Sequence, residues 1–334
     1  MIKVAINGFG RIGRLAFRQI VTQTDFDIVA INDVTSAEDL AYLVKYDTVH
    51  RSFHEDEITY EGDSIVVAGT KRIKVYSEMD PADLPWGELG VDLVLECTGK
   101  FTKYEDAKKH LDAGAKKVLI SAPGKGLMKT IVYNVNHNDL TSEDTIVSAA
   151  SCTTNCLAPV LKVINVNIGI KKGFMTTVHA YTNDQATLDI AHKKGIKARR
   201  GRACAQNIVP ASTGAAKAIG LVIPDLLNKM DGNAFRVPVA DGSVIDVTLE
   251  LKKNTTVEEI NNLFKNNQDE TLKYTEDPIV SSDIIGKKYG ALVDGLSTSI
   301  VEADGTQLVK VVAWYDNEYG YTAQMLRTAK KMFE

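Results

Sequence analysis

At 334 residues, the chain is longer than one ordinary hydrophobic core supports, so two domains are expected. Its composition of 44% hydrophobic and 25% charged residues is typical of globular proteins, and its net charge of −4 argues against a dedicated nucleic-acid-binding protein, which is usually basic. No apolar run approaches the roughly 18 residues of a membrane span, and no signal-peptide pattern opens the chain. The four cysteines lack C-x-x-C pairs, which favours free thiols in a reducing cytoplasm and disfavours a metal site.

The chain opens with a strand, a glycine-rich turn, a helix and a second strand. A β-type run at residues 2–6 precedes a G-x-G-x-x-G motif, helical spacing follows over 14–21, and the apolar run 28–31 leads to Asp33, about 20 residues after the motif. Such glycines let the backbone approach a pyrophosphate, and the acid accepts hydrogen bonds from an adenosine ribose. The pattern predicts a Rossmann dinucleotide-binding domain, and the acid favours NAD over NADP. For the motif alone, a simple tight turn stays open. The motif glycines are Gly8, Gly10 and Gly13.

Two further strand runs, 91–96 and 117–121, flank a helix-like segment. Each ends in a small polar turn, and ligands of open α/β sheets bind at such carboxyl ends. Thr98, Gly99 and Ser121 are therefore candidates for the cofactor edge. Ordinary turn chemistry is the alternative for all three.

Cys152 lies where small polar residues give way to the apolar run 157–161. With Thr154 or Asn155 as N-cap, a helix would begin there, and its positive end would favour the nucleophilic thiolate. His179, on a strand predicted over 173–181, is a possible base for this sulfur. The alternative for Cys152 is a buried, inert thiol.

The second half is dominated by β-type runs, at 173–181, 235–251, 291–301 and 307–316. Strict alternation over 243–251 suggests an antiparallel sheet with one buried face, and a helix is expected near 256–268. This half is therefore predicted to be an α+β domain. An amphipathic helix closes the chain.

Three segments offer groups that bind anions. The basic stretch 192–202 suits a polyanion, a phosphate or a neighbouring subunit, or is a solvated loop. Residues 212–217 place hydroxyls and backbone N–H groups at a helix start. Arg236 could clamp a phosphate or form a surface ion pair. Asn317 could reach a nicotinamide carboxamide or serve only in a turn.

Several of these motifs together resemble the phosphorylating glyceraldehyde-3-phosphate dehydrogenase family, over essentially the whole chain. They are Asn7-Gly8-Phe9-Gly10-Arg11-Ile12-Gly13-Arg14, Ser151-Cys152-Thr153-Thr154-Asn155-Cys156, His179-Ala180-Tyr181-Thr182, Ser212-Thr213-Gly214-Ala215-Ala216-Lys217 and Trp314-Tyr315-Asp316-Asn317-Glu318. The resemblance implies a glycolytic, NAD-dependent homotetramer acting on glyceraldehyde 3-phosphate and inorganic phosphate. It implies an NAD-binding Rossmann domain over 1–151, completed by the helix 317–334, and a catalytic α+β domain over 152–316 with an antiparallel or mixed sheet.

The resemblance also implies residue roles, with Cys152 as nucleophile and His179 as its base. The cofactor candidates, from the residues and the resemblance together, are Gly8, Gly10, Arg11, Ile12, Gly13, Asp33, Met79, Thr98, Gly99, Ser121, Asn183 and Asn317. Thr182 and Arg236 would hold the phosphate of the substrate. The site for inorganic phosphate would be lined by Ser151, Thr153, Thr213 and Gly214, with Arg200 nearby, and Cys152 would bind the substrate as its nucleophile.

The chain departs from the family pattern in places, and other functions stay open. Ile190-Ala191 replaces a Leu-Pro pair that is frequent in NAD-specific members, and Met79 replaces a basic residue, so its contact is expected through the backbone. The alternatives are an erythrose-4-phosphate dehydrogenase of the same family, a cysteine hydrolase or acyltransferase without a redox step, and a polyanion-binding protein using residues 192–202.

Overall fold

The computed structural model describes residues 1–193 and 195–334. The chain forms two compact units, each described by itself. The first unit comprises Met1–Ile131, His137–Ala150 and Met325–Glu334, and the second comprises Val132–Asn136 and Ser151–Gln324. Among the described residues, no helix combines the length and apolar character that crossing a membrane requires.

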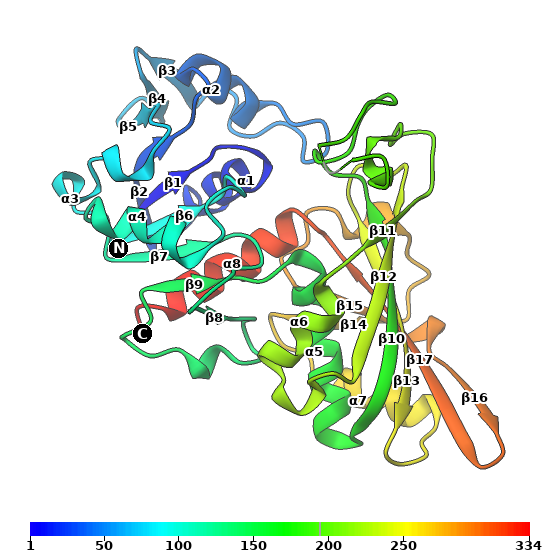
Figure 1. The fold of residues 1–334 in the computed structure, drawn as a ribbon. Coiled ribbons are helices and arrows are strands. Elements are labelled where there is room, and N and C mark those ends of the chain that lie inside the picture. Colours follow the sequence, from blue (N-terminus) through cyan, green and yellow to red (C-terminus); the bar gives the residue numbers. More distant parts are fainter. Residues whose placement is uncertain (194) are drawn as a thin grey trace. The chain divides into compact units, whose positions relative to one another are not determined.

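The first unit is built on a nine-stranded sheet with the order β3-β4-β5-β2-β1-β6-β7-β9-β8 (Figure 1). Its strands are β1 (Ile2–Asn7), β2 (Phe26–Asn32), β3 (Ile58–Glu61), β4 (Ser64–Val67), β5 (Lys71–Tyr76), β6 (Leu93–Glu96), β7 (Lys117–Ile120), β8 (Lys129–Thr130) and β9 (Ile146–Ser148). Its helices are α1 (Arg11–Ile20), α2 (Ala37–Lys45), α3 (Trp86–Leu89) and α4 (Tyr104–Asp112), with 3₁₀ turns η1 (Pro81–Asp83) and η2 (His137–Asp139).

The order of the strands explains where this unit can bind a ligand. β1 pairs in parallel with β2 on one side and with β6 on the other, so the chain changes direction across the sheet at β1. A crevice at the carboxyl ends of the strands is expected at such a switch point. The sequence prediction of a Rossmann unit is confirmed by this topology, and β3, β4 and β5 form an antiparallel meander at one edge of the sheet.

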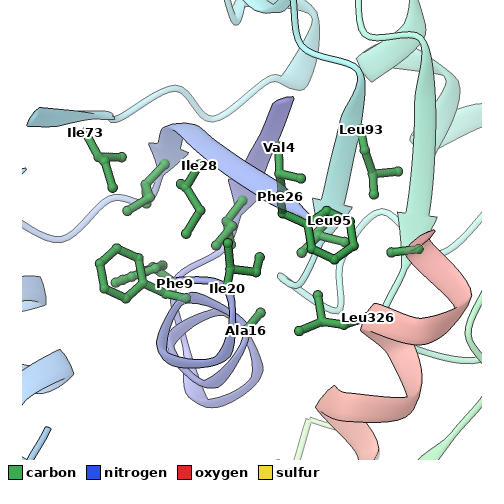
Figure 2. Close-up of a cluster of buried hydrophobic side chains, with 14 of the residues drawn as sticks. Val4, Phe9, Ala16, Ile20, Phe26, Ile28, Ile73, Leu93, Leu95 and Leu326 are labelled. Atoms are coloured by element: carbon green, nitrogen blue, oxygen red, sulfur yellow. The ribbon is translucent and has the colours of Figure 1, made fainter. Parts of the chain in front are cut away.

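One face of this sheet is sealed by a cluster of buried aliphatic and aromatic side chains (Figure 2). Phe9 and Phe17 pack edge to face with ring centroids 5.5 Å apart, which anchors helix α1 to the turn that precedes it. Leu326 joins the cluster from α8 (Tyr319–Lys331), so the C-terminal end of the chain contributes to the first unit's core.

The second unit contains an eight-stranded mixed sheet, with β11-β12-β10-β13-β17-β15-β14 in order and β16 paired to β17. Its strands are β10 (Ile170–Ala180), β11 (Val209–Ser212), β12 (Met230–Val237), β13 (Ser243–Leu251), β14 (Leu272–Thr275), β15 (Ala291–Asp294), β16 (Ser299–Ala303) and β17 (Thr306–Tyr315). Its helices are α5 (Cys152–Asn167), α6 (Ala215–Val222) and α7 (Val257–Asn266), besides the start of α8, with 3₁₀ turns η3 (Arg199–Gly201), η4 (Pro224–Leu226), η5 (Ser281–Ile284) and η6 (Gly295–Ser297).

Strand β10 shows how this sheet separates its two faces. Met175, Thr177 and His179 are buried, whereas Phe174 and Val178 on the opposite face are 71% and 36% exposed. Helix α5 contacts β10, β13 and β17, so its N-terminus is held against the buried face. The predicted α+β class is confirmed.

Two predicted strand runs differ from the structure. The run 235–251 is two strands separated by a turn, and the run 291–301 is interrupted by the 3₁₀ turn η6. The pairs β10–β12 and β14–β15 are parallel, so of the expected antiparallel or mixed sheets the structure has the mixed one. Alternation in a single sequence reports a buried face but not the direction of the neighbouring strand.

Candidate functional site: a cofactor cavity and a cysteine–histidine centre

A cavity of about 380 Å³ opens at the carboxyl ends of β1, β2 and β6 in the first unit. Gly8 and Asp33, which follow β1 and β2, line it together with Thr98, which follows β6. These strands meet at the topological switch point, where a dinucleotide is expected to bind. The remaining lining residues are Asn7, Gly10, Asn32, Val34, Glu78, Met79, Cys97, Lys100 and Phe101.

Two motif glycines are required by close backbone packing. Gly8 has φ of +87°, and a Cβ there would lie 2.7 Å from the backbone nitrogen of Thr98. A Cβ on Gly13 would lie 2.2 Å from the carbonyl oxygen of Gly8, so this glycine lets α1 pack against the turn. Gly10 has no neighbour within 4 Å of a built Cβ and is the N-cap of α1, without a side-chain cap. The open helix start and the free space over the turn fit the pyrophosphate of a dinucleotide.

The Asp33 carboxylate is positioned by two backbone groups. The N–H of Phe9 donates to Oδ2 at 2.7 Å, and the N–H of Thr35 donates to Oδ1 at 3.0 Å. These bonds tie the acid to the glycine-rich turn and orient it at the cavity that it lines. An oriented acceptor there fits the hydroxyl groups of an adenosine ribose.

The side chains of the other cofactor candidates of the first unit differ in their surroundings. The side chain of Arg11 forms an ion pair with Asp47. Burial alone would raise the pKa of the Asp47 carboxyl, but hydrogen bonds and the Arg11 guanidinium together lower this pKa to about 2. Ile12 is partly buried in the core, which leaves the backbone at the start of α1 facing a ligand. Met79 is 68% exposed and lines the cavity. The remaining two candidates are Gly99, which is exposed, and Ser121, which is partly buried beside Cys97.

In the second unit, Cys152 is the first residue of helix α5. The N-cap is Ser151, whose Oγ accepts from the Thr154 N–H at 3.1 Å, so the predicted caps Thr154 and Asn155 are wrong. Ala150, just before it, has φ of +59°, a strained conformation for a residue with a Cβ. The earlier helix start brings the sulfur itself into the first turn, where backbone N–H groups are unpaired.

The sulfur of Cys152 lies 3.4 Å from Nε2 of His179, which comes from strand β10. On the other side of the ring, Nδ1 lies 2.7 Å from the carbonyl oxygen of Ala180. Ala180 accepts from Arg236 Nη1 as well, at 3.0 Å, so a base function of His179 corresponds to the tautomer with its hydrogen on Nδ1 and its Nε2 lone pair facing the sulfur. The pair therefore has the geometry of a thiol and its base.

Burial governs the charges of this pair. It raises the pKa of the Cys152 thiol, and Arg236 and the Thr153 hydroxyl offset only part of that effect. Burial, followed by the positive charge of Arg236, lowers the pKa of His179 to about 3. Burial therefore outweighs the effect expected from the helix terminus. Proton transfer from sulfur to Nε2 would create both charges together, and it is this step that would produce the nucleophile.

Arg236, the register partner of His179 on β12, lies beside the imidazole. Its Nη1 is 2.8 Å from Nδ1 of His179 and 3.2 Å from the Thr182 hydroxyl oxygen, while its Nε is buried and has no hydrogen-bond partner among the described residues. Arg200 forms an ion pair with Asp184, and the Thr182 hydroxyl donates to the same carboxylate. The structure thus brings together two arginines and a hydroxyl beside the histidine, and the unpaired Nε suits an anion.

The hydroxyl groups nearest the cysteine are already engaged within the protein. Thr153 lies 2.9 Å and Thr177 lies 2.8 Å from the Tyr315 hydroxyl oxygen, and the Tyr315 ring meets His179 edge to face. These contacts tie the first turn of α5 to strand β10 and fix the distance between sulfur and imidazole. Thr153 is buried, so the inorganic-phosphate role predicted for it would depend on its backbone N–H.

The remaining candidates lie on separate elements. Gly214 is the N-cap of α6, and Thr213 Oγ1 accepts from the Ala215 N–H at 3.1 Å. Asn317 is buried, with Oδ1 accepting from Ser243 at 2.6 Å, and Ser243 in turn accepts from the Ala180 N–H. Asn183 is exposed. The basic stretch 192–202 includes Lys194, which lies outside the described residues.

Comparison of the sequence with known proteins shows the family of this chain. A sequence model described as glyceraldehyde 3-phosphate dehydrogenase, NAD binding domain, matches residues 2–104, and one described as the C-terminal domain of the same enzyme matches residues 151–317. The chain belongs to the glyceraldehyde-3-phosphate dehydrogenase family.

Individual members of the family are similar over nearly their whole length. The glyceraldehyde-3-phosphate dehydrogenase of Clostridium pasteurianum is 59% identical over 328 residues, which cover 98% of this chain and 97% of the relative. That of Clostridium acetobutylicum is 58% identical with the same coverage, and that of Streptococcus pyogenes is 54% identical over 329 residues, again 98% and 97%.

Several residues of this dehydrogenase-family site are not foreseen from the sequence. Asp184, Tyr315 and Ser243 hold Arg200, Thr153 and Asn317 respectively; Tyr315 lies in the family motif 314–318, which does not indicate this contact, and the other two lie in no recognisable short motif. Thr177 carries a usable signal, because it lies two residues before His179 on a strand and must therefore face the same way. Glu78 and Phe101 follow β5 and β6 in the chain, and only the path of the chain after these strands brings them to the cofactor cavity.

Proposed function

We propose that this chain catalyses the NAD-dependent, phosphorylating oxidation of D-glyceraldehyde 3-phosphate to 1,3-bisphosphoglycerate, a reaction of glycolysis. The observation that carries the proposal is the 3.4 Å contact between the Cys152 sulfur and Nε2 of a neutral His179 beside Arg236. Membership of the dehydrogenase family and its NAD-binding domain support the redox step. A hydrolase or acyltransferase without a redox step has no use for such a domain.

The first stage joins the substrate to the protein. The Cys152 sulfur attacks the aldehyde carbon, and its proton passes through His179 to the carbonyl oxygen, which gives a thiohemiacetal. Backbone N–H groups at the start of α5 and the His179 side chain would stabilise the negative oxygen as it develops. Both groups belong to the elements that position the sulfur, so the site is organised before the substrate binds.

The second stage oxidises this adduct and releases it. A bound NAD would supply the acceptor for the hydride of the thiohemiacetal carbon. His179 takes the hydroxyl proton, which leaves a thioester on Cys152. An oxygen of inorganic phosphate then attacks the thioester carbon, the carbon–sulfur bond breaks, and the products are the acyl phosphate and the Cys152 thiolate.

We infer that two anion sites serve this chemistry, since substrate and attacking group each carry a phosphate. Arg236, with its unpaired Nε, and Thr182 would hold the phosphate of the substrate. The second site would use backbone and hydroxyl donors together with nearby Arg200. Those donors are Ser151, Thr153, Thr213 and Gly214.

For the cofactor, we propose that the cavity of the first unit holds the adenosine and pyrophosphate end. Asp33 would bind the ribose, and the backbone of residues 8–13 would bind the pyrophosphate. The amide nitrogen of Asn317 would bind the nicotinamide carboxamide, because its oxygen is already held by Ser243. Asn183 and Ser121 would contact the same ligand. The NAD-binding domain would comprise residues 1–151 and 317–334, and the catalytic domain residues 152–316.

The test follows reduction of NAD by absorbance, with glyceraldehyde 3-phosphate and with or without inorganic phosphate. We expect steady turnover only when phosphate is present. Cys152→Ser should abolish turnover while NAD still binds; sustained turnover by this variant would refute the assignment of the nucleophile. A higher specificity constant for erythrose 4-phosphate, with no dependence on phosphate, would instead support the sister activity, which the names of the relatives do not favour.

We further propose that the chain works as a homotetramer in the cytoplasm. The open face of the second unit's sheet presents Phe174, and Val178 and Phe235 are exposed on neighbouring strands in register. Apolar surface of this kind is typical of subunit interfaces. The four cysteines are free, as a reducing compartment favours. Light scattering after gel filtration should give about four times the mass of 36.5 kDa; a monomer would contradict the tetramer.

A further inference from the structure

A buried carboxylate, Glu96, lies behind the cofactor cavity at the end of strand β6. Its Oε1 accepts from the Thr98 N–H at 2.8 Å and from the Thr98 hydroxyl. Its Oε2 accepts from Nδ2 of Asn7 at 2.5 Å and lies 3.0 Å from Nε2 of His110. The side chains of Glu96 and His110 are both 0% exposed. A buried group with this many donors is a built network rather than a chance contact.

The direction of each hydrogen bond in this network follows from Trp86. Its indole Nε1–H can only donate, and it lies 3.0 Å from Nδ1 of His110. Nδ1 must therefore carry the lone pair, which places the single imidazole hydrogen on Nε2, facing Glu96. The imidazole is neutral in this arrangement, and every described partner of the Glu96 carboxylate is a donor. Such an environment suits an ionised carboxylate, which only accepts.

The network continues forward to the wall of the cavity. Asn7 Oδ1 accepts from Asn32 Nδ2 at 2.7 Å, and Asn32 forms two hydrogen bonds with the backbone of Glu78, at 2.8 and 2.9 Å. Asn7, Asn32, Glu78 and Thr98 line the cavity, whereas Glu96 lies outside its lining. One carboxylate thus connects the ends of β1, β2 and β6 with the segment after β5.

The position of Thr98 makes this connection relevant to ligand binding. A Cβ built on Gly8 would touch the backbone nitrogen and Cα of Thr98 at 2.7 and 2.8 Å, so these backbones are in close contact. Glu96 holds both the N–H and the hydroxyl of Thr98. Any movement of Thr98 would therefore alter the space over the glycine-rich turn.

We propose that Glu96 is a positioning residue for the dinucleotide: with His110 and Trp86 behind it, it fixes Thr98 and Asn7 so that the cavity is shaped before the cofactor binds. The proposal rests on the proposed use of NAD. A purely structural role would instead change stability and leave cofactor affinity unaltered. The distinction is open to measurement, because NAD binding can be followed by calorimetry without turnover.

The principal variant is Glu96→Gln in the full chain. The amide keeps the size of the side chain, but its NH₂ group faces a donor from Asn7 or Thr98, so that one donor loses its partner. We expect the Kd for NAD to rise about tenfold, while kcat at saturating NAD stays within about threefold of the wild-type value. An unchanged Kd would overturn the proposal.

The double variant N7D/E96Q supplies the rescue. The carboxylate introduced at position 7 accepts from the amide introduced at position 96 and still accepts from Asn32, at the same net charge, and it replaces the Asn7 Nδ2 that lies 3.4 Å from His110 Nε2. We expect the Kd to return to within about threefold of wild type. A folded double variant that binds NAD as weakly as Glu96→Gln would count against the network.

Two further variants control for folding. Thr271→Val removes a fully buried hydroxyl of the second unit that lies 3.2 Å from Gln324 Oε1, and it should lower the Tm without changing the Kd for NAD. If Glu96→Gln does not fold, Trp86→Phe provides a second test; it removes the donor to His110 together with part of a fully buried ring, and a rise of about threefold in Kd is expected. A wild-type chain that does not bind NAD would overturn the proposed function itself, whereas equal binding by wild type and variants would overturn this inference alone.

Discussion

Arg236 and His179 are register partners on the parallel strands β12 and β10, and the guanidinium Nη1 lies 2.8 Å from the imidazole Nδ1. This fixed cation adds to the effect of burial in keeping the pKa of His179 at about 3. The imidazole is therefore neutral at pH 7, and its lone pair is available to accept a proton. The same guanidinium keeps a buried Nε without a partner among the described residues, so one side chain can influence both the base and an anion.

Arg236→Gln should separate these two effects. Without the positive charge of Arg236, binding of a second proton to His179 is less unfavourable, so the pKa of His179 rises. On acidification, the variant therefore loses activity at a higher pH than the wild type. We expect the acid limb of kcat/KM to move up by about one pH unit and the KM for glyceraldehyde 3-phosphate to rise at least about tenfold. Arg236→Lys retains the charge but not the planar fork, so only its KM should rise. Equal acid limbs in the wild type and both variants would contradict an electrostatic role.

His179→Asn tests the proton transfer. Since burial raises the pKa of the Cys152 thiol, loss of the acceptor at Nε2 should leave the sulfur protonated at neutral pH. We expect alkylation by iodoacetamide at pH 7 to slow at least about tenfold and to recover only under alkaline conditions. Cys152→Ser identifies the labelled site by mass spectrometry. An unchanged rate would mean that the helix terminus alone sustains the thiolate.

Tyr315→Phe probes the bridge between α5 and β10. The ring that packs against His179 remains, but the hydroxyl between Thr153 and Thr177 is lost. We expect a loss of about 1–2 kcal/mol in unfolding free energy and a fall in kcat of less than about tenfold, because two buried hydroxyls must find new partners. Exposed Tyr60→Phe is the matched control, since its hydroxyl bonds Glu38 at the surface. Equal effects of both substitutions would exclude the bridge.

Gly8→Ala and Gly10→Ala separate folding from cofactor binding. A methyl group on Gly8 meets the backbone of Thr98 at a positive φ, so this variant should lose at least about 2 kcal/mol of stability even without ligand. Gly10 has open space around a built Cβ, so Gly10→Ala should fold normally but bind NAD more weakly. Denaturant unfolding and calorimetry measure the two quantities. Normal NAD affinity of Gly10→Ala would argue against close approach of the pyrophosphate at this turn.

Short-range chemistry explains how much of this site is predictable from the sequence. The glycine-rich turn, Asp33 and the strand ends follow from patterns whose physical causes lie within a few residues. Strand and helix patterns suggest His179 as the base for Cys152, with family resemblance supporting the pairing. The 3.4 Å contact itself depends on how α5 lies across the sheet.

The missed features depend on contacts between distant segments. Glu96, His110 and Trp86 lie on three different elements, and nothing in their spacing predicts that they meet. The predicted N-cap of α5 is wrong because Ser151, Thr154 and Asn155 all have suitable side chains, and only the backbone conformation selects among them. Strand direction in the second sheet is likewise set by topology rather than by alternation.

Asp241→Asn should stabilise the protein at alkaline pH. Burial, followed by the negative charges of Asp316 and Glu318, raises the pKa of the Asp241 carboxyl, so the folded chain keeps a proton that the unfolded chain releases near pH 4. Stability from this group is therefore greatest at low pH and decreases as the pH rises. Asparagine can still accept from the Gly242 N–H and carries no charge to release.

We accordingly expect the Asp241→Asn variant to gain about 3 °C in Tm at pH 8, with the difference narrowing towards pH 5. Asp246→Asn is the control, because this carboxylate is 37% exposed and paired with Lys310 at 2.9 Å. Its removal should change the Tm by about 1 °C or less across the same range. A variant at position 241 that is less stable than wild type at pH 8 would show that the carboxyl is ionised in the folded chain, with a partner that asparagine cannot replace.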